Sequence, residues 1–269
     1  MIPWDVSREI FSIPLPIIGT VTIRWYGLLF AASFFIGFQI MTKIFKQENK
    51  SEKDLGDLLW YMIIATVVGA RLGHCLFYNP EYYLSHPLEI LKTWKGGLAS
   101  HGAAVGIGIG IWLYSKNKVG QSFYWVLDRV SITIALAGFF IRTGNLMNSE
   151  IIGKATDVPW SFVFVNAWVK DPMTPRHPAQ LYEALAYLAI FIIVYTIYNK
   201  SYKKLKDGYL FGVFLVLIFS ARFFIEFFKE NQEAFEQGMI LNMGQLLSIP
   251  LILWGLYLII TRKGTKQIA

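Results

Sequence analysis

Five arginines of this sequence lie inside long apolar stretches: Arg24, Arg71, Arg129, Arg142 and Arg222. A charged side chain near the centre of a bilayer costs about 2.5–3.5 kcal/mol on the insertion scale, so each of them requires an explanation. The guanidinium group stays charged when it is partly desolvated, and its planar set of donors matches the oxygens of a phosphate. These residue types therefore indicate an anionic ligand, most naturally a phosphate.

Most of these arginines fall at a common depth. Arg222 lies about 14 residues after the start of its apolar stretch, which is roughly 21 Å along a helix. Arg142 and Asn145 end another stretch and reach the same level. The other polar residues of this layer are Tyr26, Arg24, Arg71, His101, Glu183 and Glu226. Phospholipid headgroups carry the abundant phosphate at a membrane surface, so we expect this layer to bind a lipid phosphate.

Simpler interpretations apply to some of the same residues. Arg222 and Glu226 are four residues apart on one helical face and can neutralise each other. We expect Asp128 and Arg129, near the opposite end of a stretch, to extend toward the membrane surface. His101 differs from an ordinary histidine at a helix end, because glycines on both sides let another backbone or a ligand approach it closely.

The composition indicates an integral membrane protein. Of the 269 residues, 55% are hydrophobic and 16% are charged, and no polar stretch is long enough to form a soluble domain. A spanning helix needs about 20 residues to cross about 30 Å of hydrocarbon. Seven stretches are long enough, at about 19–41, 55–78, 97–115, 123–145, 178–198, 208–228 and 240–261. We predict an all-α, polytopic membrane bundle of about seven transmembrane helices, which forms a single domain over residues 1–269.

The distribution of Lys and Arg predicts the orientation. The connections after the first, third and fifth stretches and the C-terminal tail carry 13 of these residues, whereas the N-terminus and the opposite connections carry 7. Because Lys and Arg favour the cytoplasmic side, we expect the N-terminus outside, the C-terminus in the cytoplasm and the polar layer toward the outer leaflet. The net charge of +7 is then a topological signal, and no nucleic-acid partner is expected. Residues 1–11 are expected to lie on the membrane surface as a short amphipathic segment.

The glycines of the third stretch predict helix packing rather than cofactor binding. Gly102, Gly106 and Gly110 recur every four residues, which places them on one helical face where a second helix can approach closely. Cys75 is the single cysteine, so an internal disulfide and a Cys-rich metal site are excluded. No cofactor and no metal are expected.

Several motifs of the sequence resemble one known family. They read IRWYG at 23–27, GGLASHG at 96–102, RTGNLMNSE at 142–150 and RHPAQLYE at 176–183, with Arg222 and Glu226 further on. In this order and spacing they resemble the bacterial prolipoprotein diacylglyceryl transferases, over nearly the whole chain. One departure is Lys229, which stands where many members of the family have arginine.

The resemblance implies an activity. Members of the family transfer the diacylglyceryl group of phosphatidylglycerol to the thiol of the lipobox cysteine of a preprolipoprotein. The products are a thioether and glycerol 1-phosphate, and the reaction is the first step of lipoprotein maturation. The family fold is a bundle of seven spans in the bacterial cytoplasmic (inner) membrane, with its active site toward the outer leaflet. The expected partners are phosphatidylglycerol, the preprolipoprotein signal peptide and membrane lipids.

The resemblance also assigns roles to residues. The nucleophile belongs to the substrate, so the enzyme needs a base, for which His101 is the candidate, and cations for the departing glycerol phosphate, for which Arg142 and Arg222 are the candidates. These three form the expected catalytic set. The expected substrate-binding residues are Arg142, Asn145, Tyr26, Glu150, Gly153, Arg71 and Glu226. Among them, we expect Glu150 to orient an arginine or the glycerol, and the small size of Gly153 to admit lipid.

The residues alone leave two other interpretations open. A transporter or scramblase of anionic lipids could use the same arginine cluster, although it would be expected to show internal repeats or broken paired spans, and polar groups through the inner half of the membrane. A lipid-binding structural subunit is the second alternative. In that case, replacement of His101 would leave function intact.

Overall fold

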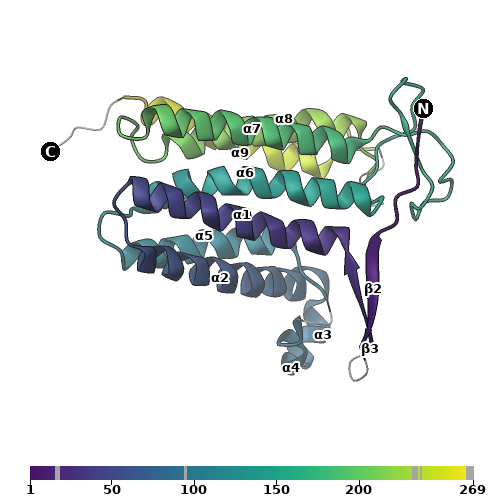
Figure 1. Ribbon diagram of the computed structural model, residues 1–269, viewed down its shortest axis with the longest axis horizontal. Helices are drawn as coiled ribbons and strands as arrows, with labels where there is room; N and C mark the ends of the chain where they lie inside the picture. Colours follow the sequence, from purple (N-terminus) through teal and green to yellow (C-terminus); the bar gives the residue numbers. More distant parts are fainter. Residues whose placement is uncertain (16–18, 94–95, 232–235, 237, 265–269) are drawn as a thin grey trace. The chain divides into compact units, whose positions relative to one another are not determined.

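The computed structural model describes residues 1–15, 19–93, 96–231, 236 and 238–264, and it is mostly helical (Figure 1). The helices are α1 (Trp25–Gln47), α2 (Glu52–Tyr78), α3 (Pro80–Ser85), α4 (Pro87–Ile90), α5 (Ser100–Lys116), α6 (Phe123–Met147), α7 (Ala179–Ser201), α8 (Tyr209–Ile225) and α9 (Met243–Thr261). A 3-10 turn, Glu226–Phe228, continues α8. The strands are β1 (Ile2–Trp4), β2 (Glu9–Leu15), β3 (Gly19–Arg24) and β4 (Phe162–Phe164).

Six of the helices are long and apolar enough to cross a membrane, among the residues that the structure describes. They are α1, α2, α6, α7, α8 with its 3-10 turn, and α9. Within the apolar windows of α1 and α9, only 28% and 22% of the residues are buried in the protein. So much exposed apolar surface requires lipid to cover it. The stretch predicted to span at 97–115 forms the helix α5, which has 17 residues.

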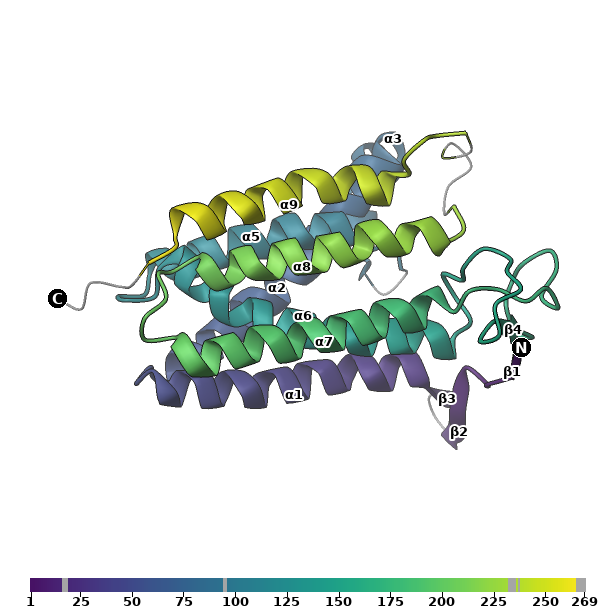
Figure 2. The ribbon, with the colours of Figure 1, turned by 90° about the horizontal axis from the view of Figure 1, so that it is seen from above.

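The short strands correct the prediction of an all-α fold. β1 pairs with β4 in a parallel sheet, and β2 pairs with β3 in an antiparallel hairpin that projects from the start of α1 (Figures 1 and 2). The first apolar stretch, predicted as a span from residue 19, therefore begins its helix only at Trp25. The β-branched residues of GTVTIR favour a strand over a helix at this point. The N-terminal residues, expected as a surface segment, contribute β1 and the start of β2.

The chain forms two compact units, one of residues 1–40 and 128–269 and the other of residues 41–127. The boundary runs through α1 and α6, and each unit holds part of the predicted site. That both units belong to one domain over residues 1–269 stays a prediction.

In the unit of residues 41–127, the glycines of α5 pack against α2 as predicted. A Cβ atom added to Gly102 would lie 2.3 Å from the carbonyl oxygen of Gly69, and one added to Gly106 would lie 2.3 Å from that of Ala65. At Gly110 it would lie 2.7 Å from the Cβ of Ala65. The helix backbones thus approach so closely that no side chain fits between them.

α2 and α5 pack antiparallel to each other. The turn that joins α1 to α2 and the turn that follows α5 therefore lie at the same end of this unit. Lys118 joins them, because its Nζ lies 2.6 Å from carboxylate oxygens of both Asp54 and Asp57. Lys50 donates to the carbonyl oxygen of Gly120 over 3.1 Å. Two of the Lys-rich connections therefore share one end of the unit, as the orientation argument requires.

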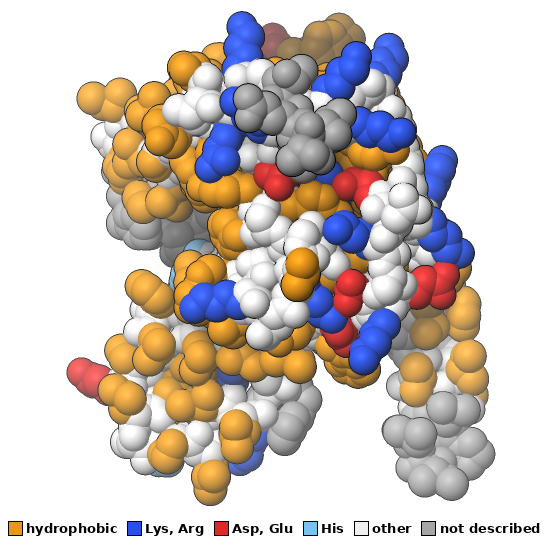
Figure 3. Space-filling model, turned by 90° about the vertical axis from the view of Figure 1, so that its left-hand side faces the viewer, with side chains coloured by type: hydrophobic (Ala, Val, Ile, Leu, Met, Phe, Trp, Pro, Cys, Tyr) orange, Lys and Arg blue, Asp and Glu red, His pale blue; other side chains and the backbone are white. Residues whose placement is uncertain are grey.

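In the unit of residues 1–40 and 128–269, α6 to α9 run alternately up and down. The turn between α7 and α8, which carries Lys203, Lys204 and Lys206, lies at the end of the unit where α9 finishes. Figure 3 looks onto this end, where Lys and Arg side chains are frequent. The candidate site residues of this unit lie at the other end.

Asp128 and Arg129 correct a second prediction, since both are buried rather than extended to the membrane surface. Asp128 accepts hydrogen bonds from the backbone N–H groups of Gly208 (2.9 Å) and Phe211 (2.7 Å). These donors open α8, where no carbonyl of the helix can accept from them and the helix dipole favours an anion. The guanidinium of Arg129 lies 3.6 Å from the Asp128 carboxylate and partly neutralises it. The two residues therefore fix the start of α8.

The glycine contact between α2 and α5 predicts a stability effect. Gly106→Leu should lower the free energy of unfolding by about 1–3 kcal/mol, because the new side chain meets backbone that cannot move aside. Thermal unfolding of the purified protein in detergent measures the change. Gly108→Leu is the matched control, since a Cβ at Gly108 on the same helix meets no atom within 4 Å. Equal unfolding midpoints for both variants would contradict the packing argument.

Candidate functional site

Two buried carboxylates lie at the centre of the site in the unit of residues 1–40 and 128–269. Glu183 of α7 is completely buried, and Glu226 at the end of α8 is nearly so. Nε of Arg142 lies 2.9 Å from Glu183, and Nζ of Lys229 lies 2.7 Å from Glu226 and 3.7 Å from Glu183. Nε of Arg222 lies 3.6 Å from Glu226. These five residues form what we call the charge network.

The antiparallel arrangement of the helices explains why the network forms. Arg142 lies in the last two turns of α6, and Glu183 lies in the first two turns of α7, so the two meet where the helices run side by side. Arg222, Glu226 and Lys229 follow one another at the end of α8 and in its 3-10 turn. The predicted convergence of Arg142, Arg222 and Glu226 is thus present within this unit.

The network carries one more positive than negative charge, since three cations face two carboxylates. Lys229 is the most buried cation, with 4% of its side chain exposed, and it bridges the two carboxylates. Arg142 is 16% exposed and Arg222 is 37% exposed. The Nε of Arg222 has no hydrogen-bond partner among the described residues. Because unpaired buried donors are costly, this excess charge suits an anionic ligand that reaches Arg222.

Asn145 extends the network to the segment that follows α6. Its side-chain oxygen accepts from Arg142 over 3.3 Å, and its amide donates to Glu150 over 3.2 Å. The backbone φ angles of Ser149 and Ile151, on either side of Glu150, are both +55°. Such values are rare for residues other than glycine and most unusual for a β-branched residue. The chain thus adopts a strained conformation that holds the Glu150 carboxylate beside Asn145.

Tyr26 joins the same neighbourhood from the start of α1. Its ring packs on Gly144, where an added Cβ would lie 2.8 Å from the ring carbon Cδ2. Gly144 stands between Arg142 and Asn145 in the sequence. The absence of a side chain there brings Tyr26 against the segment that carries both of them.

Gly153 has a different role from the one expected. Its small size was expected to admit lipid, but the space of a side chain is filled by protein, since an added Cβ would lie 2.4 Å from the carbonyl oxygen of His177 and 2.8 Å from that of Phe228. The N–H of Gly153 donates to the same His177 carbonyl over 3.0 Å. The glycine therefore joins three segments, and an isolated β-bridge ties it to Lys229.

His177, at the edge of the site, is a structural histidine. Burial lowers the pKa of its ring, so the ring is neutral at pH 7. Its Nδ1 lies 3.1 Å from the hydroxyl of Tyr182, which also accepts a hydrogen bond from Trp160. The rings of Tyr182 and Phe228 lie against this histidine and fix it.

Arg71 and His101 belong to the unit of residues 41–127. Arg71 is buried and donates to the backbone carbonyls of Glu89 (2.6 Å), Ile90 (2.8 Å) and Gly96 (2.7 Å). These bonds hold the segment between α2 and α5, and the expected role of Arg71 in substrate binding stays a prediction. The ring of His101 is exposed at the start of α5, with its centroid 5.1 Å from that of Phe77. A ligand can therefore reach His101.

A comparison with family models and a comparison with individual proteins agree on one family. A sequence model of the family described as "Prolipoprotein diacylglyceryl transferase" matches residues 13–261. The chain belongs to this family. The phosphatidylglycerol–prolipoprotein diacylglyceryl transferase of Tolumonas auensis is 48% identical to it over 249 residues, which are 93% of this chain and 95% of that protein. The protein of the same name from Chloroherpeton thalassium is 48% identical over 264 residues, with 98% and 94% covered, and that of Bacteroides fragilis is 43% identical over 268 residues, with 95% and 93% covered.

The structure adds residues to the site that neither the sequence analysis nor the family motifs singled out. A Cβ added to Gly244, at the start of α9, would lie 2.6 Å from the Glu226 carboxylate, so this position must be bare. Asn242 donates to the other oxygen of that carboxylate over 3.1 Å. Asn242 and Gln245 form a capping box. The pattern N-x-x-Q before an apolar run could have predicted where α9 begins, but not the contact with Glu226.

The position of Lys229 predicts a large effect of its charge on stability. Lys229→Met should lower the free energy of unfolding by about 3 kcal/mol, because it leaves Glu226 and Glu183 buried with one partner fewer. Lys229→Arg, which keeps the charge, should lower it much less. Thermal unfolding in detergent compares the variants with Lys154→Met, which removes an exposed lysine between α6 and α7 whose backbone N–H bonds to Phe228, next to Lys229. A midpoint for Lys229→Met that matches this control would exclude the bridging role.

Proposed function

We propose that this chain is a phosphatidylglycerol–prolipoprotein diacylglyceryl transferase. It transfers the diacylglyceryl group of phosphatidylglycerol to the thiol of the lipobox cysteine of a preprolipoprotein. A carbon–sulfur bond forms, the bond between the diacylglyceryl carbon and its phosphate oxygen breaks, and glycerol 1-phosphate leaves with the electron pair. Membership of the family and the names of full-length relatives support this function.

The observation that carries the mechanism is the excess positive charge of the network. Phosphatidylglycerol brings a phosphodiester with one negative charge, which balances the network. When the carbon–oxygen bond breaks, the phosphate gains a second negative charge. Donors that are already held in place where charge develops stabilise a transition state most effectively. Arg142, fixed by Glu183, and Arg222, the most exposed cation of the network, take this role.

A base must take the proton of the substrate thiol. An ordinary thiol has a pKa of about 8.5 and reacts as the thiolate, and an imidazole accepts a proton near neutral pH. His101 is exposed at the start of α5, with aromatic rings on one side, so it is available to a substrate. We assign proton removal to it.

The remaining polar residues fit the headgroup of the lipid. Asn145 accepts from Arg142 and donates to Glu150, so a bound glycerol hydroxyl at this point finds both donors and acceptors. Tyr26 adds a phenol from α1. Gly153 and Glu226 act on the substrate through the residues they position, and Arg71 through the segment it holds.

The proposed topology has seven spans, with α5 as the seventh, an outer N-terminus and a cytoplasmic C-terminus. It places the charge network toward the outer leaflet of the bacterial inner membrane. The Lys-rich turns support this orientation, because in each unit they lie at one end. A fluorescent protein fused after Ala269 should mature and fluoresce, whereas alkaline phosphatase at the same position should be inactive. An active phosphatase fusion would reverse the orientation.

The activity predicts the effect of three substitutions. Arg142→Ala, Arg222→Ala and His101→Gln should each lower turnover about a hundredfold or more, because removal of one stabilising donor or of the base has effects of this size. Purified protein in vesicles that contain phosphatidylglycerol is incubated with a lipobox peptide, and the thioether and the released glycerol phosphate are quantified.

Lys200→Ala, in the last turn of α7 away from the network, is the control and should keep wild-type turnover. Absence of both products with the wild-type chain, under conditions that support a characterised transferase, would refute the proposed function. Wild-type rates for both arginine variants would refute the phosphate-binding role. Little loss in His101→Gln alone would assign proton removal to another group.

A further inference from the structure

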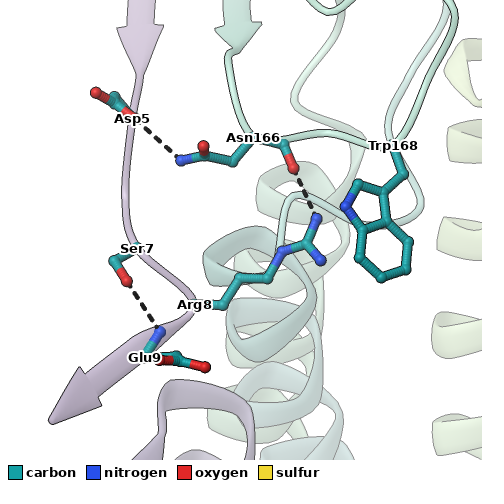
Figure 4. Close-up of a pocket in the computed structure, with 6 residues that line it drawn as sticks. All are labelled: Asp5, Ser7, Arg8, Glu9, Asn166 and Trp168. Carbon is teal, nitrogen blue, oxygen red and sulfur yellow. Dashed lines mark hydrogen bonds between the residues drawn. The ribbon is translucent and has the colours of Figure 1, made fainter.

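A cleft of about 460 Å³ opens on the unit of residues 1–40 and 128–269, outside the charge network (Figure 4). The N-terminal segment forms one wall, and the chain just after β4 forms the other. The lining residues are Asp5, Ser7, Arg8, Glu9, Asn166 and Trp168. We call it the Arg8–Trp168 cleft.

Contacts between the two walls hold the cleft in shape. The guanidinium of Arg8 donates to the backbone carbonyl of Asn166 over 2.6 Å and lies 4.4 Å from the centre of the Trp168 ring. The side-chain amide of Asn166 donates in turn to Asp5 over 3.0 Å. Figure 4 shows these side chains facing one another across the opening. Among the described residues, the guanidinium of Arg8 makes one hydrogen bond with its five N–H donors. Other donors are therefore available to a ligand.

Trp168 is the most informative residue of the cleft. It is 90% exposed although it is large and apolar, and the cation–π contact with Arg8 fixes its ring. Tryptophan and arginine are the residues most enriched among those that dominate the energy of protein–protein binding. An ordered pair of them at an open cleft indicates a binding surface.

The charges of the cleft select the class of ligand. Both carboxylates of the cleft already have partners, since Asp5 accepts from Asn166 and Glu9 lies 3.6 Å from the guanidinium of Arg24, so the charges around the cleft balance. A phosphate headgroup would find no excess of positive charge here, whereas a polypeptide offers N–H donors to the carboxylates and carbonyl acceptors to Arg8. We propose that the cleft binds the part of the prolipoprotein substrate that follows the lipobox cysteine. This inference rests on the proposed function.

Hydrogen bonds connect the cleft to the site. The backbone carbonyl of Arg8 accepts from the N–H of Trp25, the residue before Tyr26. The indole of Trp4 donates to the carbonyl of Leu146, at the end of the helix that carries Arg142 and Asn145. β1 and β4, which lead into the two walls, are paired with each other. A polypeptide whose cysteine reaches the charge network therefore finds the cleft at the same end of this unit.

Two peptides test the inference. One ends at the lipobox cysteine, and the other continues for about ten residues beyond it. Trp168→Ala and Arg8→Ala should raise the KM for the long peptide about tenfold, since the loss of one such contact is worth at least a factor of this size. Both should leave the KM and kcat for the short peptide unchanged, which also shows that the variants fold. Met173→Ala, an exposed apolar residue of the same loop outside the cleft, is the control and should change neither.

Other results overturn the inference. An unchanged KM for the long peptide, or an equal rise for both peptides, would show that the cleft does not bind the following polypeptide. A rise in the KM for phosphatidylglycerol instead would make it a headgroup surface. In each of these cases the short peptide still reports the transferase reaction, so failure of the cleft is distinguished from failure of the proposed function, in which the wild-type chain modifies neither peptide.

Discussion

Two carboxylates without access to water, Glu183 and Glu226, impose the constraint on which the site depends. A buried carboxylate is tolerated only with a cation close to it. Arg142, Arg222 and Lys229 meet this requirement, and their positions follow from it. In the proposed mechanism, the carboxylates hold the arginines in place before a substrate arrives. Free arginine side chains would otherwise lose conformational freedom when they bind a phosphate.

Positions without side chains complete the same arrangement. Gly244 leaves room for the Glu226 carboxylate, Gly144 for the ring of Tyr26, and Gly153 for the backbones of two other segments. Each glycine allows a distance that no other residue would permit. The positions of the polar residues therefore depend partly on these glycines. A substitution at one of the glycines would displace the charged or polar side chains of neighbouring residues.

The sequence predicts most of the helices and the convergence of several charged residues, because both leave local signals. Apolar stretches of sufficient length mark the spans, and charges inside them mark the layer where Arg142, Arg222 and Glu226 meet. The failures concern contacts between distant segments. Asp128, for example, is buried because it bonds to N–H groups about 80 positions away in the chain. Strands β2 and β3 were missed because an apolar run of β-branched residues reads equally well as the beginning of a span.

The length of α5 has a consequence for the depth of His101. With 17 residues the helix is about 25 Å long, whereas the hydrocarbon of a bilayer is about 30 Å thick. As the proposed seventh span, with Lys116 anchored at the cytoplasmic boundary, it ends about 5 Å short of the opposite boundary. In the proposed topology, local thinning of the bilayer around this short span would bring the imidazole and the carbon–oxygen bond of the lipid to the same level.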